Sequence, residues 1–263
     1  MKVTYFPGCT LKNKAKDLDR YARECAEILG ITLEEAENWQ CCGGVFTTAG
    51  DEIATKLSSV RVLKAAKEKG EALVTVCSAC HNVVKQTNYA MQNDRSFADK
   101  VNRYMADEEP YNGETQIYHY LELLRDVVGF DKLREKVVNP LKGKKIGAYY
   151  GCLLLRPGKV MGLDDPENPT VMEELIRALG AEPVVFANRN ECCGGYVFAE
   201  NPELAKKKST AVLSNAKANG ADMVITACPL CKYNLQKSAS DVPVVYFTEL
   251  LAEALGVKES CNE

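Results

Sequence analysis

Short runs of apolar residues recur along the chain and predict the strands of a sheet. Two runs, at residues 73–76 and 224–227, are rich in β-branched side chains and predict fully buried strands. Two further runs, at 117–120 and 244–247, occupy the corresponding place later in each half, and each is followed by a helical pattern. Strands that alternate with helices indicate an α/β fold with largely parallel sheets.

Helical spacing of apolar residues is clearest in two segments at corresponding places in the two halves. Residues 18–29 and 171–179 each carry apolar side chains at intervals of three and four, and each pattern stops at a glycine. Glycine commonly follows the last helical turn because it adopts the left-handed backbone conformation without strain. Thr170 and Glu173 have the spacing of a capping box and predict the start of the second helix.

Ten of the twelve cysteines form two matching sets of five. In each set a lead cysteine precedes a Cys-Cys-Gly-Gly segment and then a Cys-X-X-Cys motif, and these two motifs recur with one shared offset of 151 positions. The first set is Cys9, Cys41, Cys42, Cys77 and Cys80, and the second set is Cys152, Cys192, Cys193, Cys228 and Cys231. One offset shared by two motifs indicates that the chain contains a duplicated unit.

The duplication predicts two pseudo-symmetric lobes, each with a small, largely parallel sheet flanked by helices. A polar stretch at 139–144 precedes the strand that restarts the repeat, so we expect an N-terminal domain at 1–140 and a C-terminal domain at 141–263. The halves differ mainly by extra residues within 82–116 in the first and within 156–169 in the second. These insertions are where the two lobes can acquire separate roles.

The charge and hydropathy of the chain disfavour nucleic acid and membrane as partners. A net charge of −3 and an isoelectric point near 5.7 lack the basic excess that binding to nucleic acids or anionic membranes requires. No stretch approaches the roughly 18 apolar residues of a membrane span, and the N-terminal apolar run is too short for a secretory signal. We therefore expect a cytoplasmic protein. In that reducing compartment, clustered cysteines indicate metal or redox chemistry rather than disulfides.

Cysteine thiolates bind both iron–sulfur clusters and structural zinc, so the residue type alone does not identify the metal. A zinc ion or a cubane cluster is satisfied by four ligands, whereas each set offers five, two of them adjacent in sequence. Adjacent ligands beside small glycines suit a centre that is larger or less regular than a cubane. Two zinc sites with spare thiols, or one zinc site beside one cluster, stay open as alternatives.

The two histidines both lie in the first half. His81 directly follows the first Cys-X-X-Cys motif, where it can donate a hydrogen bond to a cluster sulfur or assist protonation of a product thiolate. A partly exposed histidine in the first helical turn is the alternative. His119 falls in a predicted strand, with Phe247 expected at the corresponding place of the second half, and is expected to be structural.

Four other residues complete the candidate chemistry. Cys25 lies on the apolar stripe of the first predicted helix and is expected in the core, whereas Cys261 lies in the polar C-terminal tail and is expected to be a free thiol. Arg156 and Lys159 fall in the insertion after the second lead cysteine, where they can meet an anionic substrate. A solvated loop is the alternative for both.

The complete double pattern resembles the CCG-domain proteins, and with the Tyr-Phe-Pro-Gly-Cys segment at residues 5–9 it is most similar to the B subunits of heterodisulfide reductases. The resemblance implies that each five-cysteine set holds one non-cubane [4Fe–4S] cluster. It also implies a catalytic subunit that reduces the heterodisulfide of coenzyme M and coenzyme B to two thiols, a reaction of methanogenesis. Two clusters that each exchange one electron suit this two-electron reaction.

Electrons for that reaction are expected from other subunits. The sequence contains no G-X-G-X-X-G or Walker A loop and no ferredoxin-type cysteine run, so it shows no flavin or nicotinamide site of its own. The resemblance implies a ferredoxin-like iron–sulfur subunit and a flavin-containing subunit as partners. CCG domains also occur in lactate- and glycolate-oxidising systems, so an electron-transfer subunit of an organic-acid oxidoreductase is the second hypothesis. A purely structural zinc protein is the third.

The expected position of the substrate follows from the predicted strands. Parallel α/β sheets commonly bind ligands at the carboxyl ends of their strands, where both Cys-X-X-Cys motifs are expected. We therefore expect the small-molecule disulfide to lie between the lobes, with both clusters facing one cavity.

Overall fold

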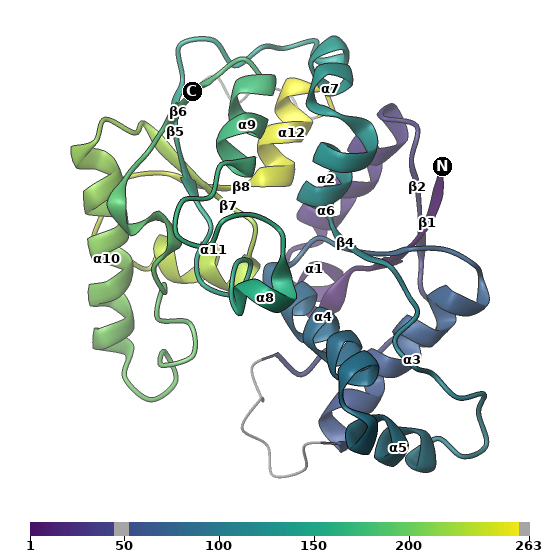
Figure 1. Cartoon of the computed structure of the whole chain (residues 1–263). Coiled ribbons are helices and arrows are strands. Elements are labelled where there is room, and N and C mark those ends of the chain that lie inside the picture. The colour runs from purple at the N-terminus through teal and green to yellow at the C-terminus, as the bar shows by residue number, and fades with distance from the viewer. Residues whose placement is uncertain (45–52, 258–263) are drawn as a thin grey trace.

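The computed structural model describes residues 1–44 and 53–257, and in these residues each half of the chain forms a four-stranded parallel sheet (Figure 1). The first sheet has the order β2-β1-β3-β4, with β1 at Lys2–Phe6, β2 at Thr32–Glu35, β3 at Leu73–Thr75 and β4 at Ile117–His119. The second has the order β6-β5-β7-β8, with β5 at Lys145–Tyr149, β6 at Glu182–Val184, β7 at Met223–Thr226 and β8 at Val244–Tyr246. The predicted α/β fold with two repeated lobes is confirmed.

The register of the last strands shows which positions of the two halves are equivalent. Thr75 of β3 pairs with His119 of β4, and Thr226 of β7 pairs with Tyr246 of β8. His119 and Tyr246 each end their strand and form the N-cap of the next helix, where a glutamate three residues later completes a capping box. The expected match between His119 and Phe247 is therefore wrong by one residue.

Helices connect the strands in both lobes (Figure 1). The first lobe contains α1 (Gly8–Asn13), α2 (Lys16–Ile28), α3 (Ala54–Glu68), α4 (Ser78–Asn93), α5 (Arg95–Tyr104), α6 (Tyr120–Glu122), the π-helical segment η1 (Leu123–Val128) and α7 (Phe130–Lys136). The second contains α8 (Gly158–Met161), α9 (Val171–Ala178), the short η2 (Ala187–Asn190), α10 (Pro202–Ala218), α11 (Pro229–Gln236) and α12 (Phe247–Ala254). The first insertion extends α4 and adds α5, and the second insertion contains α8.

The two predicted amphipathic helices form as α2 and α9, and the glycine after each one adopts the expected backbone. Gly30 has a φ of +76° and Gly180 a φ of +86°. Residues with side chains rarely adopt these positive φ angles, so the glycines allow both chain reversals.

The start of α9 differs from the prediction. Thr170 is the N-cap residue, but its side chain does not cap the helix, and the Asp164 carboxylate accepts the Thr170 backbone N–H instead, at 2.6 Å. Glu173 is buried, where its carboxylate accepts a hydrogen bond from the Tyr150 hydroxyl and pairs with Arg189 at 2.7 Å. The predicted capping box is wrong because this carboxylate compensates a buried guanidinium rather than a backbone N–H.

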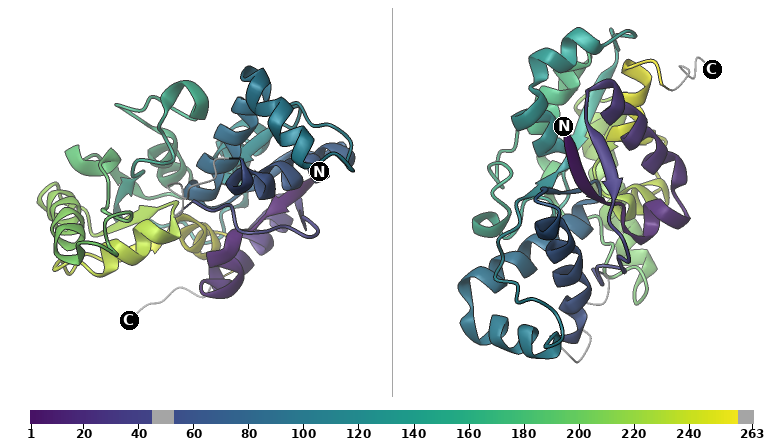
Figure 2. Two further views of the ribbon diagram at one scale, coloured as in Figure 1. Left: turned by 90° about the horizontal axis from the view of Figure 1, so that it is seen from below. Right: turned by 90° about the vertical axis from the view of Figure 1, so that its right-hand side faces the viewer.

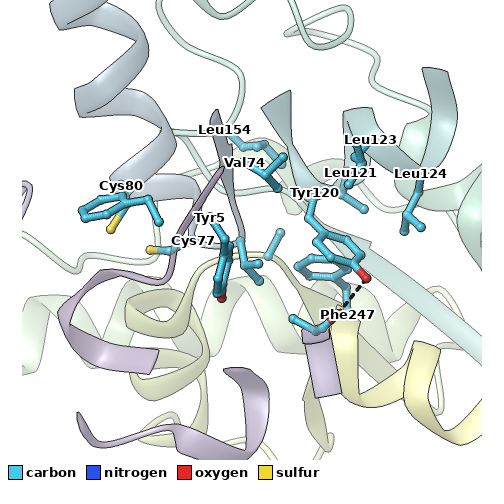
Figure 3. Packing of buried hydrophobic residues seen from close by; sticks show 14 of the residues in the cluster. Tyr5, Val74, Cys77, Cys80, Tyr120, Leu121, Leu123, Leu124, Leu154 and Phe247 are labelled. Carbon is cyan, nitrogen blue, oxygen red and sulfur yellow. Dashed lines mark hydrogen bonds between the residues drawn. The ribbon is translucent and has the colours of Figure 1, made fainter. Parts of the chain in front are cut away.

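The last helices of the two lobes are exchanged. Helix α12 of the second lobe packs on α2 of the first, and α7 of the first lobe packs on α9 of the second (Figure 1, Figure 2). The Thr248 hydroxyl of α12 donates to the Leu18 carbonyl of α2 at 3.2 Å. One apolar cluster therefore runs through both lobes, and Figure 3 shows Tyr120 of the first lobe against Phe247 of the second, with ring centroids 5.9 Å apart.

The predicted division between domains at residues 140 and 141 lies between α7 and β5, and it stays a prediction. The shared apolar cluster joins the lobes on both sides of this position. Over residues 1–44 and 53–257, no helix combines the length and the apolar character needed to cross a bilayer.

Candidate functional site

Both Cys-X-X-Cys motifs begin at the carboxyl end of a central strand. Cys77 follows β3 as the N-cap of α4, and Cys228 follows β7 as the N-cap of α11. The second cysteine of each motif lies one turn later on the same face, because residues three apart in a helix are neighbours. Strand β3 is buried over its whole length, which fixes the first motif relative to the core.

The five cysteines of the first set line one cavity of about 660 Å³, which we call the large cavity. Cys9 lies in α1 while Cys41 and Cys42 follow β2, so separate segments supply the sulfurs. The Sγ atoms of Cys9 and Cys41 are 3.5 Å apart, as are those of Cys42 and Cys80. These separations exceed the roughly 2.05 Å of a disulfide bond, so the sulfurs are free thiols that lie in contact.

The five cysteines of the second set line a second cavity, of about 20 Å³, which we call the small cavity. The Sγ atoms of Cys193 and Cys231 are 3.5 Å apart, which repeats the equivalent contact of the first set. The Asn234 side-chain amide donates to Cys193 Sγ at 3.7 Å, and the Gly194 N–H donates to Cys192 Sγ at 3.4 Å. The second set is therefore the more enclosed of the two.

The glycine before each lead cysteine allows the backbone to approach a sulfur. Gly8 has a φ of +76°, and a Cβ atom added there would lie 2.7 Å from Cys80 Sγ. Gly151 has a φ of +65°, and its added Cβ would lie 3.3 Å from Cys231 Sγ. Five sulfurs from separate segments, with the backbone cleared beside them, form the kind of donor set that a metal–sulfur cluster uses, and the cluster in each lobe stays a prediction.

The thiols within each set differ in their pKa values. In the first set, the hydrogen bond between the Cys42 and Cys80 thiols lowers the pKa of Cys42 to about 7, while burial raises the pKa of Cys41 to about 11. In the second set, a hydrogen bond from the Cys152 thiol holds the pKa of Cys192 far below its usual value. Each set therefore contains a thiol that loses its proton easily, and the thiolate is the form that binds metal.

The two cysteine sets lie beside each other at the interface between the lobes. Ser78 of the first lobe lines the small cavity, and Leu230 of the second lobe lines both cavities. The Cys77 and Cys228 side chains are close enough to share a hydrogen bond. Two adjoining cavities thus replace the single shared cavity that the sequence predicts.

His81 is fully buried and lines neither cavity. Its Nδ1 lies 3.1 Å from the Thr75 hydroxyl, and its Nε2 lies 3.3 Å from Glu122 Oε2 but outside hydrogen-bonding geometry. Burial lowers the pKa of His81 well below its usual value, so the ring is neutral. A contact between His81 and a cluster sulfur stays a prediction.

The two candidate anion contacts lie on the second insertion. Arg156 pairs with Glu167 at 2.9 Å and donates to the Asn190 carbonyl at 3.2 Å. Lys159 Nζ lies 6.0 Å from the centre of the Tyr89 ring. Neither Arg156 nor Lys159 lines a cysteine cavity, and their role in substrate binding stays a prediction.

Of the two cysteines outside the repeat, one is a core residue as expected. Cys25 is fully buried in the apolar cluster, and burial raises its pKa to about 12. Cys261 lies outside the described residues, so its expected free thiol stays a prediction.

An ion pair at the large cavity escaped the sequence analysis. Lys232 follows the second Cys-X-X-Cys motif as His81 follows the first, and Glu249 completes the capping box of α12 as Glu122 does for α6. Lys232 and Glu249 form an ion pair, and both line the large cavity. The repeat could have revealed this ion pair, because in each half the residue after the Cys-X-X-Cys motif contacts the glutamate of the following capping box.

Comparison with protein families recovers the same two units. The family model described as the cysteine-rich domain, CCG, matches residues 3–85 and 146–236. Each matched range begins in the first strand of a lobe and ends after its Cys-X-X-Cys motif.

Similar proteins extend over nearly the whole chain. The 8-methylmenaquinol:fumarate reductase membrane anchor subunit of Wolinella succinogenes is 33% identical, over 97% of this chain and 93% of its own length. The B subunit of the ferredoxin/F(420)H(2)-dependent CoB-CoM heterodisulfide reductase of Methanosarcina acetivorans is 28% identical, over 97% of this chain and 89% of its own. A solved structure of a hypothetical protein from Helicobacter pylori shares the fold, with a TM-score of 0.70 and 12% identity over 98% of this chain and 49% of that one.

Proposed function

Because the chain belongs to the cysteine-rich CCG-domain family and is related along its length to reductase subunits, we propose that it is the catalytic iron–sulfur subunit of a reductase complex. The observation that carries the proposal is the convergence of each five-cysteine set on one cavity, with the two cavities adjoining between the lobes. One centre in each lobe gives the two electron-transfer sites that a two-electron reaction requires.

We assign one non-cubane [4Fe–4S] cluster to each set of five thiolates, on the chemistry of the donor set. Such a cluster, when bound, exchanges electrons one at a time. The chain would hold each cluster through three buried sulfurs, those of the Cys-X-X-Cys motif and of the second cysteine in the Cys-Cys-Gly-Gly segment, and through two more accessible ones. Leu230 lines both cavities and would therefore stand between the two centres.

The first candidate reaction is the reduction of an organic disulfide, such as the heterodisulfide of coenzyme M and coenzyme B. The S–S bond breaks, two electrons and two protons are taken up, and two thiols are released. The electrons come from partner subunits, for which we propose a ferredoxin-like iron–sulfur subunit and a flavin-containing subunit. The relative named as the B subunit of a heterodisulfide reductase supports this candidate. We expect the complex to work in the cytoplasm.

The second candidate is an electron-transfer subunit of an organic-acid or quinol-linked oxidoreductase. The relative at 33% identity, named as a subunit of a fumarate reductase that uses 8-methylmenaquinol, favours it. In this role the paired centres pass electrons between partners, and no disulfide is cleaved.

An anaerobic assay separates the two candidates. The chain is purified with its co-purifying subunits and supplied with a reduced viologen dye and a small disulfide. The first candidate requires that two dye molecules are oxidised for each disulfide and that free thiols appear in proportion. If the protein instead oxidises a quinol with an organic acid as acceptor and releases no thiol, the second candidate is supported. If the protein shows neither activity, both candidates are contradicted.

A further inference from the structure

The repeat places different side chains at one buried position beside the two cysteine sets. Val83 of α4 and Asn234 of α11 each lie three residues after the second cysteine of their Cys-X-X-Cys motif, and they are 151 positions apart, as the motifs are. They are 4% and 2% exposed. Residues three apart in a helix share a face, so both side chains lie on the face that carries a cysteine sulfur.

Contacts with the two Cys-Cys-Gly-Gly segments show that these positions are also equivalent in space. A Cβ atom added to Gly44 would lie 3.5 Å from Val83 Cγ2, and one added to Gly195 would lie 3.4 Å from Asn234 Nδ2. In both lobes the second glycine of the segment therefore leaves room for this helix side chain beside the preceding cysteine.

Of these two side chains, only the Asn234 amide forms a hydrogen bond to that cysteine. Its Nδ2 donates to Cys193 Sγ at 3.7 Å. Val83 has an apolar side chain and offers Cys42 neither an N–H nor an O–H. A thiolate that binds metal carries no proton and only accepts hydrogen bonds, which matches the N–H that faces Cys193.

The packing of the core does not account for the Asn234 amide. Over residues 1–44 and 53–257, no group donates to its Oδ1 atom, although that atom is buried. An unpaired oxygen in the core costs free energy, and the valine at the equivalent position of the first repeat has no such oxygen. The contact of this side chain with the sulfur is therefore the better explanation of its presence.

A second polar side chain near the same sulfurs is directed elsewhere. Tyr149 lies three residues before the lead cysteine of its repeat, where the first repeat has Phe6. Its hydroxyl donates to the Glu191 carbonyl at 2.7 Å, so its proton is used by the backbone. Asn234 thus remains as the side-chain amide that distinguishes the second set from the first.

The second set is also the more enclosed one, and enclosure and hydrogen bonding act in opposite directions on a redox centre. Cys9 and Cys41 are exposed, whereas Cys152 and Cys192 are half-buried. A cluster on five thiolates is anionic, and low-dielectric surroundings oppose the gain of a further negative charge. An N–H that points at a ligand sulfur stabilises that charge. Asn234 therefore counteracts the effect of enclosure.

We propose that Asn234, through its hydrogen bond to Cys193, raises the reduction potential of the centre on the second cysteine set. The inference rests on the proposed function, because it requires a redox centre in each lobe. Asn234 acts through a ligand and touches no reacting atom, so it is a positioning residue that adjusts electron transfer.

Reciprocal substitutions test the proposal. Asn234→Val gives the second repeat the residue of the first, and Val83→Asn does the reverse. Redox titration of the anaerobically purified protein, followed by electron paramagnetic resonance, measures the potentials of both centres. Asn234→Val should lower the ratio of reduced to oxidised protein about tenfold at one centre only, a shift of about 59 mV for one electron. Val83→Asn should raise the potential of the other centre.

Asn88→Val is the matched control. It removes a buried amide from α4, but that amide donates to the Thr115 carbonyl at 3.2 Å and not to a sulfur, so both potentials should stay unchanged. Iron and sulfide are measured for every variant and should equal those of the unmodified protein. Asn234→Val decides the inference even where Val83→Asn does not fold, since the first repeat already carries valine at this position.

Three outcomes would overturn the inference: unchanged potentials in Asn234→Val, the same shift in Asn88→Val, or a loss of iron in Asn234→Val, which would assign the amide to retention of the metal. Protein without iron and sulfide would overturn both this inference and the proposed function. The expected shift without turnover of any disulfide or quinol would support the inference and contradict the proposed reaction alone.

Discussion

The backbone N–H of Ser78 donates a hydrogen bond of 3.0 Å to the carbonyl of Ala227, and the repeat cannot supply the reverse bond. The residue equivalent to Ser78 is Pro229, which has no N–H. The carbonyl of Val76, equivalent to that of Ala227, accepts from the Tyr246 hydroxyl at 2.8 Å instead. The lobes therefore meet through an asymmetric contact directly before both Cys-X-X-Cys motifs.

Removing the Tyr246 hydroxyl should weaken this contact. Tyr246→Phe leaves the ring in the core but deletes the hydrogen bond, so we expect the free energy of unfolding to fall by about 1 kcal/mol. Urea denaturation under anaerobic conditions measures the change. Tyr118→Phe, in the neighbouring sheet, removes a hydroxyl bonded near the surface and should change the stability by less than about 0.5 kcal/mol. Equal effects of the two substitutions would contradict the role of Tyr246.

A methyl group at Gly8 should displace metal from the first lobe. The added Cβ would lie 2.7 Å from Cys80 Sγ, so the sulfur would have to move. Gly30→Ala is the matched control, because Gly30 has the same φ of +76° but no atom within 4 Å of an added Cβ. We expect iron and sulfide per chain to fall by about half in Gly8→Ala and to stay constant in Gly30→Ala. Similar iron content in both variants would show that Gly8 is needed only for its backbone conformation and not for space beside the Cys80 sulfur.

The metal itself is open to direct analysis. Protein purified without oxygen should be brown and contain about eight irons and eight sulfides per chain, as two four-iron clusters require. Cys42→Ala and Cys193→Ala should each abolish disulfide turnover, because a two-electron reaction needs both centres. Cys25→Ala, a substitution in the core, should leave the iron content unchanged. Two zinc ions without sulfide, or near-normal turnover in either ligand variant, would contradict the assignment.

The repeat, the strands and the cysteine positions were predictable because the evidence for them is local. A buried run that ends in Cys-X-X-Cys predicts both the strand and the side of the sheet where its sulfurs lie, and Cys77 and Cys228 lie there. The close approach of Gly8 to Cys80 was not among these predictions, which concerned only the glycines after the adjacent cysteines.

Features that depend on distant segments were not predictable in this way. The spacing of Thr170 and Glu173 is that of a capping box, yet Arg189 binds the carboxylate from another part of the lobe. The anion contacts predicted after the second lead cysteine stay predictions, but no local pattern indicates that the Asn82 amide of the other lobe binds the carbonyls of Leu153 and Arg156. In both cases tertiary packing decides the outcome, and no local pattern encodes it.

The buried pair of Glu173 and Arg189 should matter for stability. Glu173→Gln keeps the shape of the side chain but leaves the guanidinium without its counter-charge in the core, so we expect a loss of about 3 kcal/mol. Glu174→Gln, on the exposed side of the same helix, should change the free energy of unfolding by less than about 0.5 kcal/mol. Denaturation monitored by circular dichroism measures both. A loss below about 1 kcal/mol in Glu173→Gln would show that Arg189 finds another partner.

The exchange of α12 and α7 between the lobes constrains how such a molecule can arise. A single repeat on its own would leave the apolar face of its first long helix uncovered, since the helix that covers that face belongs to the other repeat. It could bury this face only by pairing with a second copy, as a symmetric dimer of one gene product. Joining two copies in one chain keeps the repeats paired and allows each half to change separately; within the described residues, α7 of the first half has no counterpart after α12. One half could then acquire the segment at 153–161 that covers α4, while the other half kept an accessible cavity beside α11.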